Sequence, residues 1–435
     1  MADRLFRLYC FWKEHGTVAA WRIIRRKYFN RSLLVTGSDS FSMTDKKIPL
    51  SPAKLIDIHF ESLRPLRAYY PPGAHARRVS MVTDSINDGS LYGGVGTALI
   101  FSALLANHLG ASLRVITRTQ RARPANLERL LSTVSIELAG ESEFRHAAFY
   151  DPNYQIDILP DEVFVTTSWW TTAAALPSVS PSQLIYLLQE DERMFYPFGD
   201  ERLKCESIMR NTEIRFLINS KLLYDYFCKE GFQNIATRGI WFEPAFPPAV
   251  FHPRGGGQQG KKRFLFYARP KNNARNLFFL GLEVIEQSII EGVLDLDQWE
   301  IILVGKDIPV LVFNGIKPDR YENMTWSDYA ALIGTVDLGL TLMYTPHPSY
   351  LPLDLAASGA VVVTNRFDNK TDLSSYSPNI LCADINRGAL VDALRVGVEL
   401  AFDQPARERN FLQNNLQTDW GDTLARAIEF ASVDR

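Results

Sequence analysis

A break rich in proline and glycine separates two stretches of the chain in which strand-like and helix-like segments alternate. It holds four prolines between residues 244 and 253 and continues into Gly-Gly-Gly-Gln-Gln-Gly at 255–260. Proline stiffens a chain and glycine makes it flexible, so this segment is the best candidate for an interdomain linker. Strand–helix–strand units on both sides imply parallel sheets, because parallel neighbours need a crossover connection. The sequence therefore predicts two Rossmann-like α/β lobes.

The spacing of apolar residues predicts the elements of each lobe. In the first lobe we expect a helix over 97–109 and strands over 78–86, 113–117, 163–167, 183–188 and 214–219. In the second we expect strands over 263–269, 300–304, 338–344, 360–365 and 380–383, and helices over 277–291, 326–333, 353–357 and 388–402. Such sheets bind ligands beyond the carboxyl ends of their strands, so the expected site is a cleft between the lobes.

The remaining segments complete the expected organisation. Residues 32–76 contain several prolines and no regular pattern, which indicates an irregular connector that wraps the first lobe. The expected division is an arm and connector at 1–76, lobes at 77–250 and 251–420, and a helical tail at 421–435.

Composition excludes several classes of protein. The 435 residues are 46% hydrophobic and 22% charged, which rules out wholesale disorder. A net charge of −2 is not that of a protein built to coat nucleic acid. Four scattered cysteines without CxxC spacing exclude a disulfide framework and a cysteine zinc site, and they suit a reducing, cytoplasmic compartment. The longest uncharged stretch, 90–113, is interrupted by glycines and predicts a loop and a buried helix rather than a membrane span.

The first 31 residues differ from the rest of the chain. They carry eight basic and two acidic residues, a net charge of +6, among large apolar and aromatic side chains. Aromatic residues opposite a basic face suit a helix that lies on anionic lipid, which would place the protein at the inner face of the plasma membrane. A helical arm packed on the body with a solvated basic face fits equally well.

A glycine loop at 91–97 lies between a predicted strand and a predicted helix. Gly93 and Gly94 would let a ligand approach the backbone where helix amides favour anions. The full dinucleotide fingerprint is absent, because its third glycine position falls on Leu99, and Arg118 stands where an acidic residue would end the next strand. Two interpretations stay open, a ligand-binding loop and a tight turn that packs helix on sheet.

Basic and polar side chains gather at three strand ends of the second lobe. They are Tyr267 and Arg269, then Gly305 and Lys306, then Tyr344, His347, Ser349, Tyr350 and, in the first turn of a short helix, Asp354. Two cations and a helix N-terminus facing one crevice are what a diphosphate needs. Taken singly, Asp354 is equally a carboxylate favoured by the helix dipole, and His347 equally a loop histidine without a role. Their joint position favours a functional site.

At these residues the chain resembles GT-B glycosyltransferases of glycosyltransferase family 4, and within them the WsaF-like rhamnosyltransferases of bacterial surface-glycan synthesis. The stretch "VDLGLTLMYTPHPSYLPLDLAASGAVVVTN" resembles the pattern in which two Glu residues, with seven residues between them, precede Ala-x-Ala-x-Gly. Asp354 takes the place of the second Glu and Pro346, beside His347, that of the first. "FLFYARPKNNARNLF" and "IILVGKD" resemble the segments that supply the family's phosphate-binding Arg and second basic residue.

The resemblance implies a two-lobed GT-B enzyme with an N-terminal acceptor lobe and a C-terminal donor lobe. It implies transfer with retention from a nucleotide-activated sugar, dTDP-β-L-rhamnose, to a glycan or lipid-linked oligosaccharide, with no resident cofactor and no metal. Arg269, Lys306 and the 347–350 loop would hold the diphosphate and Asp354 the pentose, with Gly93, Gly94, Tyr267, Gly305 and Tyr344 lining the donor site. "TTSWWTTAA" and "QEDERMFYPFG" would line the acceptor side through Trp169, Trp170, Glu190 and Asp191.

Some assignments remain open on the residues alone. For Glu190 and Asp191 a solvated loop is the favoured interpretation, and Asp295-Leu296-Asp297 indicates a surface turn rather than a metal site. The same fold serves sugar-nucleotide epimerases, which need histidines and carboxylates in the cleft. A third interpretation is a non-catalytic sugar-nucleotide-binding subunit at the membrane, because Pro346 and Asp354 stand where the family pattern has its two Glu residues.

Overall fold

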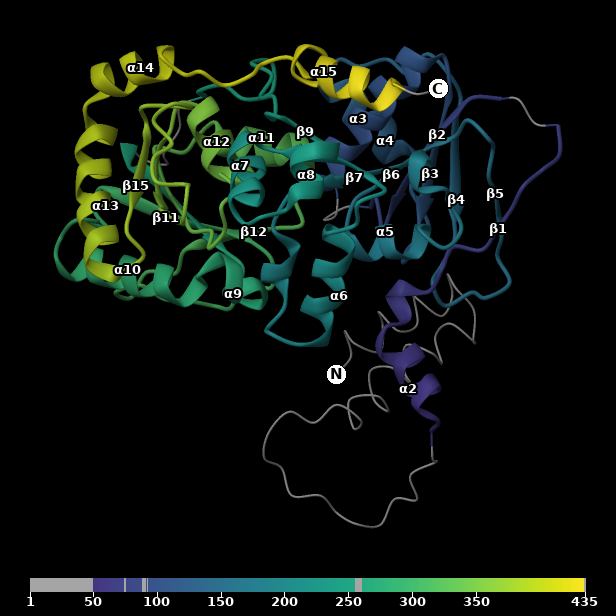
Figure 1. Cartoon of the computed structure of the whole chain (residues 1–435). Coiled ribbons are helices and arrows are strands. Elements are labelled where there is room, and N and C mark those ends of the chain that lie inside the picture. The colour runs from purple at the N-terminus through teal and green to yellow at the C-terminus, as the bar shows by residue number, and fades with distance from the viewer. Residues whose placement is uncertain (1–49, 74–75, 88–90, 92, 255–259, 434–435) are drawn as a thin grey trace, which may run out of the picture. The chain divides into compact units, whose positions relative to one another are not determined.

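The computed structural model of the chain describes residues 50–73, 76–87, 91, 93–254 and 260–433 (Figure 1). Contacts divide the chain into two compact units, Met1–Ile56 and Asp57–Arg435. The basic arm expected at 1–31 lies outside the described residues. Within the part of the chain that is described, no helix has the length and apolar character needed to cross a membrane.

The connector is less irregular than the sequence indicates. Helix α2 covers Pro52–His59, a 3-10 turn covers Glu61–Leu63, and strand β1, Ala68–Tyr69, pairs in parallel with β5, Ile156–Asp157. These elements are too short to produce a clear hydrophobic period, which is why the sequence pattern misses them. Leu66 is buried in the core of the first lobe, so this part of the connector packs on that lobe as expected.

The first lobe is built on a seven-stranded parallel sheet of order β4-β3-β2-β6-β7-β8-β9. Its strands are β2 (Arg78–Thr83), β3 (Ser112–Thr117), β4 (Ser142–His146), β6 (Val163–Thr166), β7 (Leu184–Leu188), β8 (Arg215–Asn219) and β9 (Gly239–Phe242). Its helices are α3 (Gly94–Leu109), α4 (Pro124–Thr133), α5 (Trp169–Ala175), α6 (Asp200–Met209), α7 (Lys221–Lys229) and α8 (Gln233–Arg238). Val79 and Met81 of β2 pack beneath α3 and α4, whereas Val82 joins the core beneath α5 to α8. Helices on both faces explain why this strand is apolar or buried throughout.

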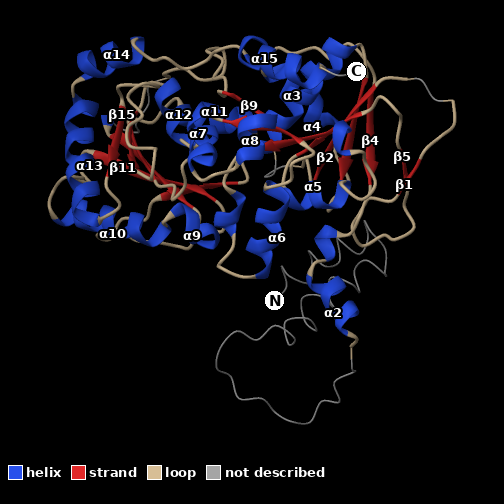
Figure 2. Ribbon diagram, viewed as in Figure 1, coloured by secondary structure: helices blue, strands red, loops and turns tan. Residues whose placement is uncertain are grey.

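The second lobe repeats the arrangement with six parallel strands in the order β12-β11-β10-β13-β14-β15. Helices, drawn in blue, flank the red strands of both lobes in Figure 2. The strands are β10 (Lys262–Ala268), β11 (Trp299–Gly305), β12 (Asp319–Glu322), β13 (Leu338–Thr341), β14 (Val361–Asn365) and β15 (Ile380–Ala383). The helices are α9 (Asn273–Asn276), α10 (Phe278–Ile290), α11 (Trp326–Ile333), α12 (Tyr350–Ala357), α13 (Arg387–Phe402) and α14 (Gln404–Leu412). α10 and α13 cover one face of the sheet, and α11 and α12 cover the other.

Two segments connect the lobes. The chain leaves the first lobe after β9, and it returns at the C-terminus as helix α15, Trp420–Ser432, which packs against α3 (Figure 1). Trp420 and Leu424 of α15 are buried in the core of the first lobe. The two segments touch where the Phe246 N–H donates to the Gln417 carbonyl at 2.7 Å. The helical tail expected at 421–435 is thus a helix that belongs structurally to the first lobe.

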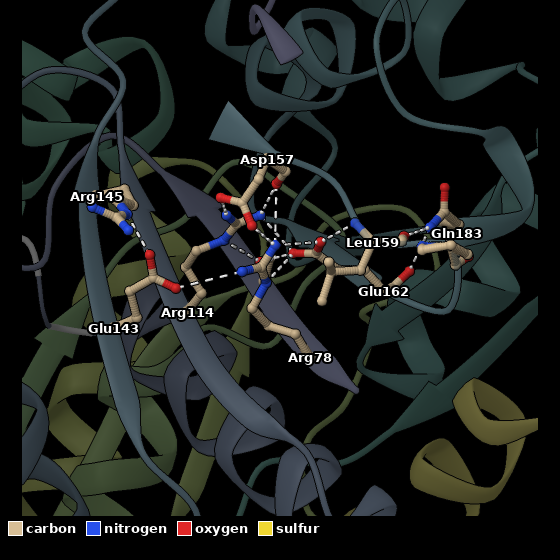
Figure 3. Close-up of polar contacts among 10 residues, drawn as sticks. Arg78, Arg114, Glu143, Arg145, Asp157, Leu159, Glu162 and Gln183 are labelled. Atoms are coloured by element: carbon tan, nitrogen blue, oxygen red, sulfur yellow. Dashed lines mark hydrogen bonds and ion pairs between the residues drawn. The ribbon is translucent and has the colours of Figure 1, made fainter. Parts of the chain in front are cut away.

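A buried ion cluster lies at the amino ends of first-lobe strands, since Arg78 is the first residue of β2 and Glu162 directly precedes β6. Figure 3 shows its polar contacts. Arg114 of β3 and Glu162, just before β6, are both fully buried and lie 2.6 Å apart. Arg78 of β2 also contacts Glu162, at 2.9 Å, and both arginines reach Asp157 of β5, at 2.7 and 3.0 Å. Ser80 donates a short hydrogen bond to Glu162. Two arginines and two carboxylates thus balance in charge and fasten the β1–β5 pair to the sheet.

Candidate active site

One cavity of about 560 Å³ is lined by the carboxyl ends of both sheets. Twelve residues expected from the sequence line it, namely Gly93, Gly94, Trp170, Glu190, Tyr267, Arg269, Gly305, Lys306, His347, Ser349, Tyr350 and Asp354. Among the further lining residues, Asp84 and Tyr329 lie outside the segments singled out in the sequence, whereas Gln189 and Glu192 lie in "QEDERMFYPFG" and Arg275 lies in "FLFYARPKNNARNLF". Asp84 directly follows β2, so its place at a carboxyl strand end is the signal that could have identified it.

Arg269 and Lys306 follow two adjacent strands of the second lobe. The ends of β10 and β11 are paired, Ala268 with Gly305, so the next residue of each strand emerges at the same edge. Arg269 donates to the Tyr267 hydroxyl at 3.3 Å, and neither cation has an ion-pair partner among the described residues. A Cβ on Gly305 would lie 1.8 Å from the Ala268 carbonyl oxygen, so this glycine is required by strand packing.

His347 is held as a neutral hydrogen-bond donor. Its Nδ1 accepts the backbone N–H of Ser349 at 2.9 Å, which leaves the proton on Nε2. Burial, with the nearby cations Lys370 and Arg275, lowers the pKa of His347 to about 3. Nε2 is buried and has no hydrogen-bond partner among the described residues. The ring therefore presents an N–H group in a loop that lines the cavity.

Asp354 lies in the second turn of α12, not in the first as the sequence suggested. The helix begins at Tyr350, three residues earlier than expected, because Pro352 is tolerated where backbone N–H groups lack helical partners. The Tyr329 hydroxyl donates to Asp354 Oδ2 at 2.6 Å. Burial raises the pKa of Asp354 to about 7, since the charged form is poorly solvated there.

The glycine loop meets Tyr350 of the other lobe. The Tyr350 hydroxyl lies 2.5 Å from Thr97 Oγ1 and accepts a hydrogen bond from Asn219 Nδ2 at 2.6 Å. Gly93 has a φ of +60°, and a Cβ there would lie 3.2 Å from the Tyr350 ring. A Cβ on Gly96 would lie 2.7 Å from the Leu91 carbonyl oxygen. Gly96 therefore fits the tight-turn interpretation, and Gly93 allows close contact between the lobes.

Glu190 and Asp191 do not form the solvated loop that the sequence favoured. Asp191 is fully buried and pairs with Arg193 through two contacts, at 2.9 and 2.8 Å, away from the residues that line the cavity. Glu190 does line the cavity, and burial raises its pKa to about 7 although Arg275 opposes the shift. In the sequence the charged run at 190–193 looks solvent-exposed, but the second lobe covers this segment. The guanidinium of Arg275 stacks on the Phe195 ring, 4.5 Å from its centroid.

Of three further residues predicted to line the site, one lines the cavity and two do not. Trp170 lines the cavity, and its Nε1 donates to Asp84 Oδ2 at 2.9 Å. Trp169 is instead in the core of the first lobe, where its Nε1 donates to the Tyr196 hydroxyl at 3.0 Å. Tyr344 also lies outside the cavity lining and packs edge-on against Phe367. For both Trp169 and Tyr344, a neighbouring residue of the same helix or loop lines the cavity instead.

The described residues contain no group of His, Cys, Asp and Glu suited to a metal ion. The Asp295-x-Asp297 pair forms a turn in which Asp295 accepts the backbone N–H of Asp297 at 2.9 Å. That agrees with the surface turn expected from the sequence.

Comparisons with known proteins place the chain in a family. Residues 78–221 match the family model of the WsaF N-terminal domain and residues 262–395 that of the WsaF C-terminal domain. The O-antigen biosynthesis protein RfbC of Myxococcus xanthus is 28% identical over 358 residues, or 80% of this chain. That alignment covers 26% of RfbC, so the chain spans about a quarter of this relative's length.

Solved structures show the same fold at low sequence identity. Sucrose-phosphate synthase from Thermosynechococcus elongatus has a TM-score of 0.57 and 11% identity, covering 81% of this chain and 98% of its own. WaaG, a glycosyltransferase involved in lipopolysaccharide biosynthesis, has a TM-score of 0.56 and 12% identity, covering 82% and 100%. Anabaena HepE, solved with UDP and glucose, has a TM-score of 0.53 and 10% identity, covering 82% and 100%. Because WsaF models match both lobes and together cover more than half of the chain, the chain belongs to the WsaF family, and the solved structures show that it has the GT-B fold.

Proposed function

We propose that the chain transfers L-rhamnose from dTDP-β-L-rhamnose, with retention at the anomeric carbon, to a bacterial surface glycan or its lipid-linked precursor. The observation that carries the proposal is the placement of Arg269 and Lys306, two cations without ion-pair partners in the described chain, at paired strand ends in one cavity. A nucleoside diphosphate supplies the matching negative charge. The resemblance to WsaF-like enzymes supports the sugar, and HepE, crystallised with UDP and glucose, supports a nucleotide-sugar donor.

The proposed mechanism rests on stabilising the negative charge that develops on the leaving diphosphate. When the bond between the anomeric carbon and the diphosphate oxygen breaks, negative charge grows on the leaving group. Arg269 and Lys306 neutralise that charge, and the Nε2–H of neutral His347 adds a fixed hydrogen-bond donor. Asp354, oriented by Tyr329, accepts a hydrogen bond from the 3′-hydroxyl of the deoxyribose. No protein nucleophile is needed, because positioning and charge stabilisation supply the catalysis.

A turnover assay tests the proposal against its alternatives. Purified protein is incubated with isotope-labelled dTDP-β-L-rhamnose and a glycan extract, and products are separated by chromatography and examined by NMR. We expect label in glycan, with an anomeric configuration equal to that of the donor. Conversion of the donor to an isomer identifies an epimerase. Saturable donor binding without turnover identifies a non-catalytic subunit.

We expect donor binding to strengthen as pH rises through about 7. The 3′-hydroxyl of the deoxyribose donates to ionised Asp354 and so lowers its pKa from about 7, which means that binding releases a proton. The dissociation constant should fall about tenfold for each unit by which the pKa drops, and level off above pH 8. Calorimetric titration with dTDP-rhamnose from pH 5.5 to 8.5 measures this, because the sugar-linked diphosphate does not itself titrate there. Asp354→Asn keeps an acceptor for Tyr329 and should flatten the profile; an unchanged profile contradicts the assignment.

We expect transfer to continue without a divalent metal. Two cations and a hydrogen-bond donor neutralise the charge of the diphosphate, which a metal ion would otherwise do. Initial rates measured after treatment with excess EDTA should equal those of untreated enzyme. Loss of activity that manganese restores would overturn this expectation.

The arm at residues 1–31 is proposed to bind anionic membrane. At about 1 kcal/mol for each basic residue near such a surface, its net charge of +6 is sufficient for reversible attachment. Co-sedimentation with phosphatidylserine vesicles should be lost when residues 1–31 are deleted, whereas dTDP binding should persist. Equal sedimentation of both proteins at low salt shows that the arm is structural.

A further inference from the structure

The first-lobe side of the cavity contains a carboxylate and an aromatic ring that are hydrogen-bonded to each other. Asp84 follows β2 and Trp170 is the second residue of α5, so both stand at carboxyl ends of neighbouring strands. The Trp170 indole N–H donates to Asp84 Oδ2 at 2.9 Å. Both side chains are partly exposed and line the cavity that also holds Arg269 and Lys306.

Asp84 retains an unused acceptor. Its Oδ1 makes no hydrogen bond or ion pair with any described residue, while Oδ2 is occupied by Trp170. Burial raises the pKa of Asp84, and the Trp170 hydrogen bond and nearby Arg118 oppose this shift only in part. The N–H groups of Arg118 donate to the carbonyls of Ala147 and Arg64. Asp84 therefore offers the cavity a carboxylate oxygen whose charge is only partly compensated.

The ring of Trp170 is fixed in orientation. One side is held by the hydrogen bond to Asp84, and the buried ring of Trp169 packs edge-to-face against it, with centroids 6.3 Å apart and planes at 86°. A rigid aromatic surface gives contact area at low entropic cost, and a polar group beside it fixes the orientation of a ligand. A pyranose ring matches both parts, since one face is made of C–H groups and its rim carries hydroxyls.

We propose that Asp84 and Trp170 form the binding subsite for the terminal sugar ring of the glycan acceptor. The C–H face of that ring packs on Trp170, and one of its hydroxyls donates to Asp84 Oδ1. The subsite lies on the lobe opposite Arg269 and Lys306 and lines the same cavity, so the acceptor sugar and the donor share one cavity. This inference rests on the proposed glycosyltransferase function and adds to it the residues that recognise the acceptor.

Saturation-transfer NMR on the full chain tests the subsite. The probes are the methyl glycosides of α-L-rhamnose, β-D-galactose and β-D-glucose, each added in the presence of saturating dTDP. We expect at least one glycoside to receive saturation on one ring face, with binding weakened tenfold or more in Asp84→Asn and in Trp170→Ala. Asp84→Asn places an N–H₂ group where the hydroxyl needs an acceptor, and Trp170→Ala removes the surface.

Trp241→Phe is the matched control, because Trp241 of β9 is a partly exposed indole of the same lobe that lies outside the cavity lining. Its glycoside binding should stay within twofold of the wild type. Calorimetric dTDP binding by every variant shows that the fold and the donor site are intact. In the wild type, the indole N–H signal of Trp170 should also shift on addition of the glycoside, which requires no stable variant.

The outcomes separate the two proposals. If the wild type binds no glycoside, or if Asp84→Asn and Trp170→Ala bind as the wild type does, the subsite is wrong although dTDP binding and transfer persist. If the wild type binds neither dTDP nor dTDP-rhamnose, the proposed function itself fails. Weakened glycoside binding with intact dTDP binding supports both.

Discussion

Replacing Arg269 with alanine lowers the rate of sugar transfer about 100-fold or more at saturating substrate. The guanidinium has no ion-pair partner in the described chain, so its charge is available to the leaving diphosphate. The interaction strengthens as charge develops, and losing one preorganised donor of this kind costs about 100- to 1,000-fold in rate. Lys306→Ala should have a similar effect, because Lys306 emerges from the adjacent strand end.

Steady-state kinetics on folded variants measures this effect. Arg269→Lys should recover only part of the rate, since a two-pronged hydrogen-bonding group becomes a point charge. Lys271→Ala is the matched control, because Lys271 is an exposed cation of the same segment that pairs with Asp307 at 3.0 Å and does not line the cavity. Near wild-type rates for both Arg269→Ala and Lys306→Ala would remove the proposed diphosphate site.

The fold was predictable because its strands are buried on both faces. Val361, Val362 and Val363 of β14 form a continuous apolar run that only a covered parallel strand produces. The expected helix at 326–333 and the expected strand at 380–383 agree with α11 and β15 to the residue. By contrast, β4 and β12 are edge strands with polar, partly exposed sequences, and no hydrophobic period distinguishes them from loops.

The candidate site was predictable where position along a strand decides it. Arg269 and Lys306 follow apolar strands, so the parallel topology alone brings them together. Contacts between distant segments could not be derived in this way. Arg275 and Lys370 of the other lobe favour the charged form of buried Glu190, and buried Asp191 pairs with Arg193. Likewise, only the direction in which α5 leaves β6 decides that Trp170, not Trp169, lines the cavity.

Replacing Glu162 with alanine should destabilise the first lobe by about 3–5 kcal/mol, the usual cost of removing one partner from a buried charge pair. Glu162 accepts hydrogen bonds from Arg78, Arg114, Ser80 and the backbone N–H of Leu159, and it is fully buried (Figure 3). Without it, Arg78 and Arg114 keep Asp157 as their shared close carboxylate, and only Arg78 has a further, longer contact, to partly exposed Glu143. Glu143→Ala is the control, since Glu143 touches Arg78 at 3.6 Å from a partly exposed position and should cost under about 1 kcal/mol.

Thermal melting followed by circular dichroism checks the size of the loss, and a second variant checks its cause. If uncompensated charge is responsible, replacing Arg114 and Glu162 together with apolar residues of similar volume should recover much of the stability, because Arg78 and Asp157 remain as a balanced pair at 2.7 Å. If lost packing is responsible, Glu162→Gln, which keeps the volume, should melt like the wild type. The cluster lies at the amino ends of the strands, so dTDP affinity of the folded variants should be unchanged. A Glu162→Ala protein that melts with the wild type would show that the arginines are neutralised by other means.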